Sequence, residues 1–336
     1  MAAYDNIRLE KGLYTTGKSF TQALESLDPS ENYRGTALEG LDAYQRQLKR
    51  FGIKVSGRSS DTIEKFFRTT DSAALFPEYI SRAVHQGFEE NDIASRMVAT
   101  TTEIDSLDYR SLAVDITKNE TYMNPVFEGA HIPETRVSVK SNLVKLEKIG
   151  RMITASYEAV KHQRLDLFTI ALRQIGSAIA TTQAYRAIDT LLQGDGTEGE
   201  SEFIFIDDPD TLSYNDLLSL WAAFKGFNLS TIIMGTGTLT KVLKMDEFKD
   251  SAASRSFDGT GKVVTPFGAE LLRYDGMPEG TLLALDKNFA LEKVQAGNVV
   301  TEADKLIDRQ LERAAVTSTV GFAKIFADAA VALKVN

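Results

Sequence analysis

The sequence contains no cysteine and few residues of several other types. Its 336 residues include no Cys, three His, one Trp and seven Pro. Without cysteine the chain can form neither a disulfide bond nor a Cys-based zinc site, and nothing indicates an oxidising compartment. The histidines are scattered, and only His162 has a carboxylate one helical turn away, that of Glu158. Such a pair is typical of a protein surface, so we expect no metal site.

Two further absences concern membranes and nucleic acids. The opening residues, MAAYDNIRLEK, hold no apolar run, so we expect no signal peptide. The longest uncharged part of the most helical stretch, residues 174–185, is too short to cross a bilayer, so we expect no membrane partner. The net charge of −9 argues against a protein whose main task is to grip nucleic acid.

Residues 157–193 are the longest regular feature, and we predict that they form one helix. They contain no Pro, Ser156 precedes them as an N-cap, and Gly194 follows them. Apolar or small residues recur at helical spacing, which predicts a buried face. We predict that this core face includes Phe168, Ala171, Ile175, Tyr185, Ile188 and Leu192. Four further apolar residues lie partly off this face: Leu165, Leu172, Ile179 and Leu191. By periodicity alone, the core helix of an α/β enzyme fits equally well.

Residues 1–70 are polar and have the pattern of short helices. Ser19 with Gln22, and Thr36 with Glu39, match the capping box that begins a helix. The apolar stripe after Thr36 is too short to bury a core alone, so we predict an arm that docks elsewhere. The residues predicted to make this contact are Leu38, Leu41, Tyr44 and Leu48. In residues 71–100, Pro77 suits the first turn of a helix.

Residues 101–155 change to strand-like alternation, interrupted by turn residues at 124–135. We predict a long two-stranded excursion here. Because an isolated hairpin is marginally stable in water, this excursion should lie against another copy of the chain. Residues 201–286 then alternate strands with helices at 214–226 and 238–249, and residues 287–336 return to strand patterns. Ser213 and Asp216 form a further capping box.

One motif indicates a different class of protein. Gly12–Ser19 satisfies G-x-x-x-x-G-K-[ST], the loop that wraps nucleotide phosphates. Such a loop follows a buried strand, whereas the residues before Gly12 alternate charged with aliphatic side chains. A P-loop NTPase is therefore the weaker alternative. Acid-rich residues 194–200 and 207–210 lack the full spacing of a calcium loop. We predict no catalytic residue, no cofactor and no metal ligand.

Several motifs, taken in order, resemble those of the tailed-phage major capsid proteins. Residues 75–80 (LFPEYI) resemble the segment where the N-terminal arm enters the peripheral (P) domain of that family. Residues 128–134 (EGAHIPE) resemble a motif along its E-loop, and residues 148–158 the descent into its spine helix. Residues 308–312, 321–325 and 329–333 resemble its closing strands. The resemblance covers residues from about 70 to 336.

The resemblance implies an α+β protein with the phage major capsid fold (Hong Kong 97-like), which has an N-arm, a long β-hairpin E-loop, a P domain with a long spine helix, and an α/β axial (A) domain. The implied boundaries are 1–70 for the N-arm, 71–100 for the segment from arm to P domain, 101–155 for the E-loop, 156–200 for the P domain with spine helix, 201–286 for the A domain, and 287–336 for the C-terminal strands of the P domain.

The function implied by the resemblance is that of a structural major capsid protein. Such proteins self-assemble into pentamers and hexamers of an icosahedral shell enclosing double-stranded DNA. The implied inter-subunit contacts of the E-loop are Pro125, Phe127, Glu128, Gly129, Ile132 and Pro133. The implied inter-subunit contacts of the N-arm are its stripe residues Leu38, Leu41, Tyr44 and Leu48. The implied partners are copies of the chain itself, portal and scaffolding proteins, a decoration protein in some members, and packaged DNA through non-specific contact. The implied location is the virion capsid, after assembly in the host cytoplasm.

The sequence leaves two points open. An encapsulin-like nanocompartment shell shares the fold and is the alternative function. Some family members also form Lys–Asn crosslinks, for which this chain offers Lys118, Lys140 and Lys145 with Asn288 and Asn298. Nothing in the sequence brings these groups together, so we expect no crosslink.

Overall fold

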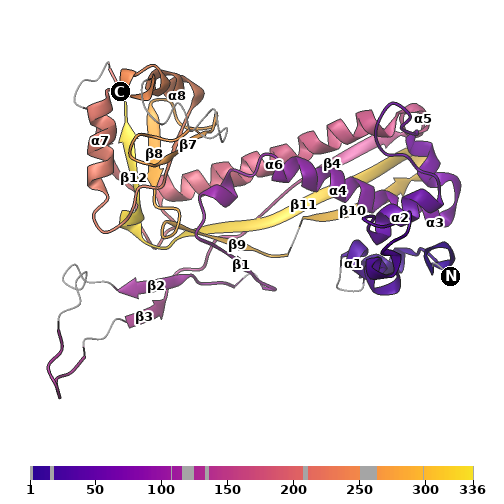
Figure 1. The fold of residues 1–336 in the computed structure, drawn as a ribbon, viewed down its shortest axis with the longest axis horizontal. Helices are drawn as coiled ribbons and strands as arrows, with labels where there is room; N and C mark the ends of the chain where they lie inside the picture. Colours follow the sequence, from indigo (N-terminus) through magenta and orange to yellow (C-terminus); the bar gives the residue numbers. More distant parts are fainter. Residues whose placement is uncertain are drawn as a thin grey trace. The chain divides into compact units, whose positions relative to one another are not determined.

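The computed structural model describes residues 3–15, 19–106, 108–115, 125–132, 136–206, 211–249, 263–297 and 299–335. These residues combine helices and sheets, as the predicted α+β class requires (Figure 1). The chain divides into two units. Unit one consists of Met1–Asn91, Ile149–Ile179 and Asn298–Ser318, and unit two of Asp92–Lys148, Ala180–Gly297 and Thr319–Asn336.

Unit one begins with short helices, of which those written η are 3-10 helices. They are η1 (Ala3–Asn6), η2 (Lys11–Thr15), α1 (Phe20–Leu27), η3 (Ser30–Tyr33), α2 (Ala43–Arg50), η4 (Ile63–Arg68), α3 (Thr70–Ala73) and α4 (Phe76–Glu89). The capping box predicted at Ser19 is confirmed, and so is Pro77 in the first turn of α4. The box predicted at Thr36 is wrong, because α2 begins later, with a capping box at Asp42. Gly40 has a φ of +80°, so the backbone before Asp42 does not continue as a helix.

A buried ion pair holds α1, η3 and α2 together. The fully buried Arg46 donates from Nε to Oδ2 of Asp28 at 2.7 Å. The same guanidinium donates to the carbonyl of Leu41 at 2.6 Å and to the hydroxyl of Ser30 at 2.9 Å. The hydroxyl of Tyr33 donates to the other oxygen of Asp28 at 2.6 Å. Residues 20–50 are therefore folded onto themselves through a fully partnered buried network.

The contacts predicted for this segment are corrected in part. Tyr44 and Leu48 are only 3% and 6% exposed, so unit one itself covers them. The guanidinium of Arg82, on α4, lies 4.4 Å from the ring centre of Tyr44. The apolar stripe of α2 thus has its partner within the chain, and these two side chains do not face a neighbouring subunit. Leu38 and Leu41 are half-buried, and for them an inter-subunit contact stays a prediction.

The helix predicted at 157–193 is two helices, α5 (Tyr157–His162) and α6 (Leu165–Gln193). Ser156 caps α5 by accepting a hydrogen bond from the N–H of Ala159, as predicted for an N-cap. The break between the helices comes from tertiary hydrogen bonds. Ile63 donates its N–H to the carbonyl of Gln163 at 3.0 Å, and Arg164 forms a β-bridge with Thr62.

The buried face of α6 is rotated from the predicted one. Ile188 and Leu192 are buried and Phe168 and Ile175 are half-buried, but Ala171 and Tyr185 are exposed. The most buried residues include Leu165, Leu172, Ile179, Ala180, Ala184, Ala187 and Leu191. Because the helix is apolar on several sides, its neighbours decide which side is covered.

In unit one, α4 is the neighbour that crosses α6. Gly87 on α4 and Gly176 on α6 mark the crossing point. A Cβ atom on Gly176 would collide with the carbonyl of Val84, and one on Gly87 with the carbonyl of Arg173. The two backbones therefore approach more closely than any larger residue would allow.

The strands of unit one lie beside one another. They are β4 (Glu147–Ser156), β10 (Val300–Leu306) and the first part of β11 (Leu311–Lys324). β10 and β11 pair antiparallel through the short η6 (Ile307–Arg309), and β4 also pairs with β11 (Figure 1). β11 is long enough to contribute its remaining residues to unit two.

Unit two contains a five-stranded sheet in the order β5-β12-β8-β6-β7. Its strands are β5 (Glu202–Phe205), β6 (Thr231–Met234), β7 (Glu270–Arg273), β8 (Thr281–Leu285) and β12 (Ala330–Lys334). The helices of this part are α7 (Tyr214–Ala223), α8 (Thr236–Leu243) and α9 (Asp246–Lys249). The capping box at Ser213 is confirmed, whereas the helix predicted at 238–249 is divided between α8 and α9.

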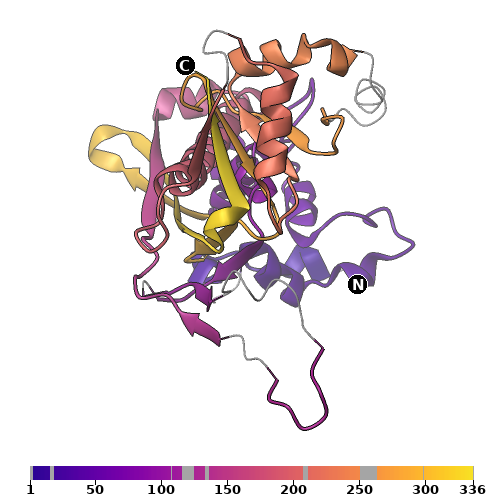
Figure 2. The same ribbon diagram turned by 90° about the vertical axis from the view of Figure 1, so that its left-hand side faces the viewer.

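The position of β12 differs from the prediction that 287–336 closes the P domain. β12 lies between β5, to which it is parallel, and β8, to which it is antiparallel. Residues 330–333 are all buried, and α7 packs alongside this strand (Figure 2). Its uninterrupted apolar sequence suits a strand that is covered on both faces.

A second group of strands in unit two leads to the site described next. β1 (Thr100–Glu103) pairs parallel to β9 (Leu291–Gln295), and β9 pairs antiparallel to residues 320–324 of β11. The short segments η5 (Ala94–Arg96) and η7 (Ala327–Ala329) flank these strands. Residues 144–145 pass directly over Gly321 of β11, where an added Cβ would lie 2.6 Å from the carbonyl oxygen of Lys145.

Candidate assembly site

A two-stranded ribbon in unit two has an exposed apolar face. It consists of β2 (Leu112–Asp115) and β3 (Arg136–Val139), which pair antiparallel with Leu112 opposite Val139 (Figure 1). Because side chains alternate along a strand, Leu112, Val137 and Val139 share one face, and Ser138 lies on the other. The three apolar side chains are 46%, 62% and 64% exposed. Among the described residues, neither strand pairs with a third. This apolar face is a surface that another polypeptide can cover.

The segment between the two strands is also exposed. Residues 125–132 are exposed throughout, with Phe127 at 83% and Ile132 at 71%. A turn presents Phe127: the N–H of Ala130 donates to its carbonyl at 3.0 Å, and Gly129 adopts a φ of +77°. The predicted contact residues Pro125, Phe127, Glu128, Gly129 and Ile132 all lie here, and their contact with a neighbour stays a prediction. Pro133 lies outside the described residues.

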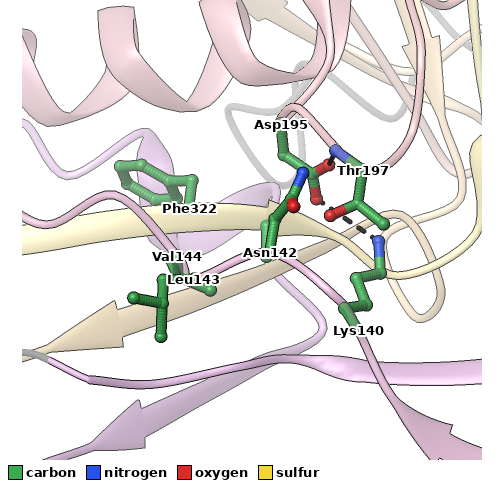
Figure 3. Close-up of a pocket in the computed structure, with 8 residues that line it drawn as sticks. Lys140, Asn142, Leu143, Val144, Asp195, Thr197 and Phe322 are labelled. Atoms are coloured by element: carbon green, nitrogen blue, oxygen red, sulfur yellow. Dashed lines mark hydrogen bonds and ion pairs between the residues drawn. The ribbon is translucent and has the colours of Figure 1, made fainter.

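The returning strand of the ribbon is anchored by Lys140, which directly follows β3 and is 3% exposed. Its Nζ donates to the carbonyl of Lys324 at 2.6 Å and lies 3.3 Å from Asp195 and 3.4 Å from Glu198. Figure 3 shows the Lys140 side chain reaching toward Asp195. Lys140 thus joins the ribbon to β11 and to the loop after α6.

The cavity beside Lys140 is lined by Asn142, Leu143, Val144, Asp195, Thr197 and Phe322, among others (Figure 3). Its volume is about 10 Å³. That is room for about one water molecule, so this cavity is part of the anchor and not a ligand site.

The charges of this anchor are tuned by burial and by hydrogen bonds. Burial alone would raise the pKa of Asp195, but the N–H groups of Glu198 and Thr197 and the charge of Lys140 hold that pKa below its ordinary value of 3.8. Both N–H groups donate to Oδ1 of Asp195 at 2.8 Å. Burial lowers the pKa of the Lys324 ammonium group, and the neighbouring acids Asp195 and Glu198 oppose that shift.

The outgoing strand of the ribbon is anchored by Glu292 on β9, which is 5% exposed. Its carboxylate accepts hydrogen bonds from the hydroxyls of Thr102 and Tyr109, each at 2.6 Å, and from that of Ser111. Burial, together with the bond to Glu292, raises the pKa of the Tyr109 hydroxyl. The N–H of Lys140 donates to the carbonyl of Ser111 at 2.9 Å, which connects the two strands at the base.

The sequence alone does not identify these anchor residues as a group. It presents Lys140 only as a candidate for crosslinking, and Asp195 only within an acid-rich turn. The available signal is the charged pair Glu292–Lys293 in the strand-like stretch FALEKVQ, because charges that a strand buries require partners. Those partners come from distant segments, which one sequence does not reveal.

Local geometry does not support the nucleotide-binding loop of the weaker alternative. Residues 3–15 contain η1 and η2 in place of the strand that a phosphate-binding loop follows, and residues 16–18 lie outside the described residues. No metal-binding group of three or more His, Cys, Asp or Glu occurs within the described ranges. In that part of the chain, no helix is long and apolar enough to cross a membrane. Of the crosslinking candidates, Lys118 and Asn298 lie outside the described residues.

Comparisons with known proteins agree with the architecture. The sequence model of a family described as phage capsid protein matches residues 140–331, more than half of the chain. Among solved structures, the chain is similar to the virus-like particle from Pyrococcus furiosus, with a TM-score of 0.54 and 13% identity over 76% of this chain and 98% of that one. It is similar to the capsid of an empty GTA particle computed with C5 symmetry, with a TM-score of 0.51 and 12% identity over 71% and 89% of the two chains. It is also similar to Microbacterium phage Oxtober96, with a TM-score of 0.53 and 10% identity over 73% and 91%. No curated protein sequence matches the chain.

Proposed function

The chain belongs to the phage capsid protein family, and we propose that it assembles into pentamers and hexamers of an icosahedral shell around double-stranded DNA. Membership in this family and the shared fold make it a capsid shell protein with a structural role. The arrangement of its copies and the contents of the shell are the parts that we propose.

The observation that carries this proposal is the uncovered apolar face of the ribbon. Leu112, Val137 and Val139 expose about half or more of their side chains, and water is a poor solvent for such a face. Covering the three would contribute roughly 3 kcal/mol for each copy, because burying one whole side chain of this kind contributes about 1.5–3 kcal/mol. Such a contact is weak alone but is repeated at every subunit of a closed assembly.

A second apolar surface supports contacts between copies. On α6, Leu167 and Ile170 lie one helical turn apart and are 58% and 63% exposed. We propose that the ribbon and this surface of α6 lie in contacts between neighbouring copies. We propose the same for the predicted contact residues between the two strands of the ribbon, which are Pro125, Phe127, Glu128, Gly129, Ile132 and Pro133. Leu38 and Leu41 are proposed to contribute at the same kind of contact. The similar GTA capsid, which is computed with C5 symmetry, supports five-fold rings in a shell of this fold.

The proposed partners are those that a shell filled with DNA requires. They are further copies of the chain, portal and scaffolding proteins, a decoration protein, and DNA held by non-specific contact. The net charge of −9 suits a container that releases its DNA, because strong neutralisation of phosphates would retain it. The proposed location is the virion capsid, after assembly in the host cytoplasm.

The test compares two variants of the ribbon. Val137→Ser with Val139→Ser removes apolar area from the exposed face, and Ser138→Ala on the opposite face is the control. Because these side chains are exposed, we expect the free energy of unfolding to change by less than about 0.5 kcal/mol in both. Loss of about 2 kcal/mol of contact energy should raise the protein concentration needed for shells about thirtyfold, as counted by negative-stain microscopy. Normal shells from the double variant, or wild-type protein that stays monomeric, would contradict the proposal.

A shell without a genome is the second candidate. The observation that favours this second function is the similarity to a virus-like particle from Pyrococcus furiosus. An encapsulin-like compartment would contain a cargo protein in place of DNA. Nuclease treatment followed by analysis of the shell contents distinguishes the two.

A further inference from the structure

We infer that Glu292 is a positioning residue that fixes the direction in which the ribbon leaves the sheet of β1 and β9, with Lys140 as the matching anchor on the returning strand. The inference deepens the proposed function and rests on it, because the ribbon matters only if it contacts another copy. Its structural part concerns the isolated chain and can be tested without assembly.

Glu292 connects the sheet to the outgoing strand at three places. Thr102 belongs to β1, which pairs with β9, whereas Tyr109 and Ser111 belong to the segment that leaves the sheet and enters β2. The carboxylate of Glu292 therefore accepts hydrogen bonds from hydroxyl groups of the sheet and of the segment that leaves the sheet. Within the described ranges no Lys, Arg or His nitrogen forms an ion pair with Glu292.

A buried carboxylate without a cation is costly unless its hydroxyl donors stay in place. The donors cannot move away without leaving that charge unpartnered, so the cost of desolvation restrains the chain segment. This differs from an ordinary surface hydrogen bond, which exchanges with water at little cost. Glu292 thus restrains the position of Tyr109 and Ser111, three and one residues before the first residue of β2.

The two anchors act on different strands and use different chemistry. Glu292 is an acceptor that holds the outgoing strand, and Lys140 is a donor that holds the returning strand against β11 and Asp195. Two points of attachment fix a direction, whereas one point would permit rotation. The apolar cluster beside these anchors has three buried members, Val144, Val294 and Ala323, with three partly buried residues around them, and so provides limited packing.

The experiment measures hydrogen–deuterium exchange in the full-length, unassembled chain. The variants are Glu292→Gln, Lys140→Met and the double variant, with Glu279→Gln, an exposed glutamate of unit two, as the control. We expect Glu292→Gln to speed exchange about tenfold in peptides covering 104–115, and Lys140→Met to do so in peptides covering 136–146. The double variant should speed both. Peptides from β8 and β12 should be unchanged, which distinguishes a local anchor from a general loss of stability.

Shell formation is then measured with the same proteins. Folded Glu292→Gln protein should give fewer or irregular shells, whereas Glu279→Gln should match the wild type. If Glu292→Gln does not fold, Tyr109→Phe removes one donor and should give a smaller local increase in exchange. Exchange at 104–115 within twofold of wild type, equal acceleration in β8 and β12, or normal shells despite a loosened ribbon would each overturn the inference. Wild-type protein that never assembles would refute the proposed function, while the exchange data would still decide on the anchor.

Discussion

Replacing Arg46 with Met tests whether residues 20–50 are an integral part of unit one. The variant keeps most of the side-chain volume but removes the bonds to Asp28, Ser30 and Leu41. It leaves the carboxylate of Asp28 buried with the Tyr33 hydroxyl as a neutral partner. Removing one member of a buried ion pair typically costs about 3–5 kcal/mol. For a unit of this size the melting temperature should fall by about 10 °C.

The assay follows unfolding in urea by far-UV circular dichroism, together with hydrogen exchange in residues 20–50. Arg34→Met is the control, because Arg34 lies in the same segment and is exposed, and it should change stability by less than about 0.5 kcal/mol. A double-mutant cycle with Asp28→Asn should give a coupling energy of about 2 kcal/mol or more, because the double variant no longer buries an unpaired charge. If Arg46→Met behaves like Arg34→Met, the segment is a loosely attached arm and the reasoning from burial fails.

Two further predictions concern other parts of the chain. Asp195→Asn should destabilise unit two by about 1–3 kcal/mol at pH 7, since it weakens hydrogen bonds to a charged group. Because the pKa of Asp195 lies below 3.8 in the folded chain, its contribution is present above that pH and is lost as the pH falls further, so wild type and variant should converge in acid. Urea unfolding followed by the fluorescence of Trp221, which lies in unit two, checks this, and an equal difference at pH 7 and pH 2 would contradict it. Gly176→Ala should cost about 1–3 kcal/mol or more by overpacking the crossing of α4 and α6, whereas Gly237→Ala, with open space around it, should be neutral or slightly stabilising; thermal unfolding of both variants tests the contrast.

Local signals in the sequence predicted several local structures, although the capping box predicted at Thr36 was wrong. Three such predictions depend only on residues close together in the chain, and each is confirmed. They are the capping box at Ser19, the N-cap at Ser156 and the proline in the first turn of α4. The run of motifs indicated the capsid family, and the α+β class followed from that resemblance. The exposed segment at 125–132 could also be anticipated, because its turn residues interrupt the strand pattern.

Features that depend on distant partners could not be predicted in this way. The side of α6 that is buried depends on α4 and on strands far away in sequence, and periodicity selected Ala171 and Tyr185 wrongly. The burial of Tyr44, on α2, depends on its contact with Arg82, which lies on α4. The hydroxyls that surround Glu292 come from residues about 180 to 190 positions earlier in the chain. No local pattern records such pairings.

The placement of β12 has a consequence for synthesis of the protein. The sheet of unit two cannot be completed before residues 330–334 have left the ribosome, because among the described strands only β12 joins β5 to β8. A prematurely terminated chain therefore lacks an internal strand and exposes two unpaired edges. Such a fragment should be cleaved by proteases faster than the chain that contains β12. The sheet of unit two therefore forms late in synthesis, because β5 and β8 are joined by a strand that follows them both in the chain.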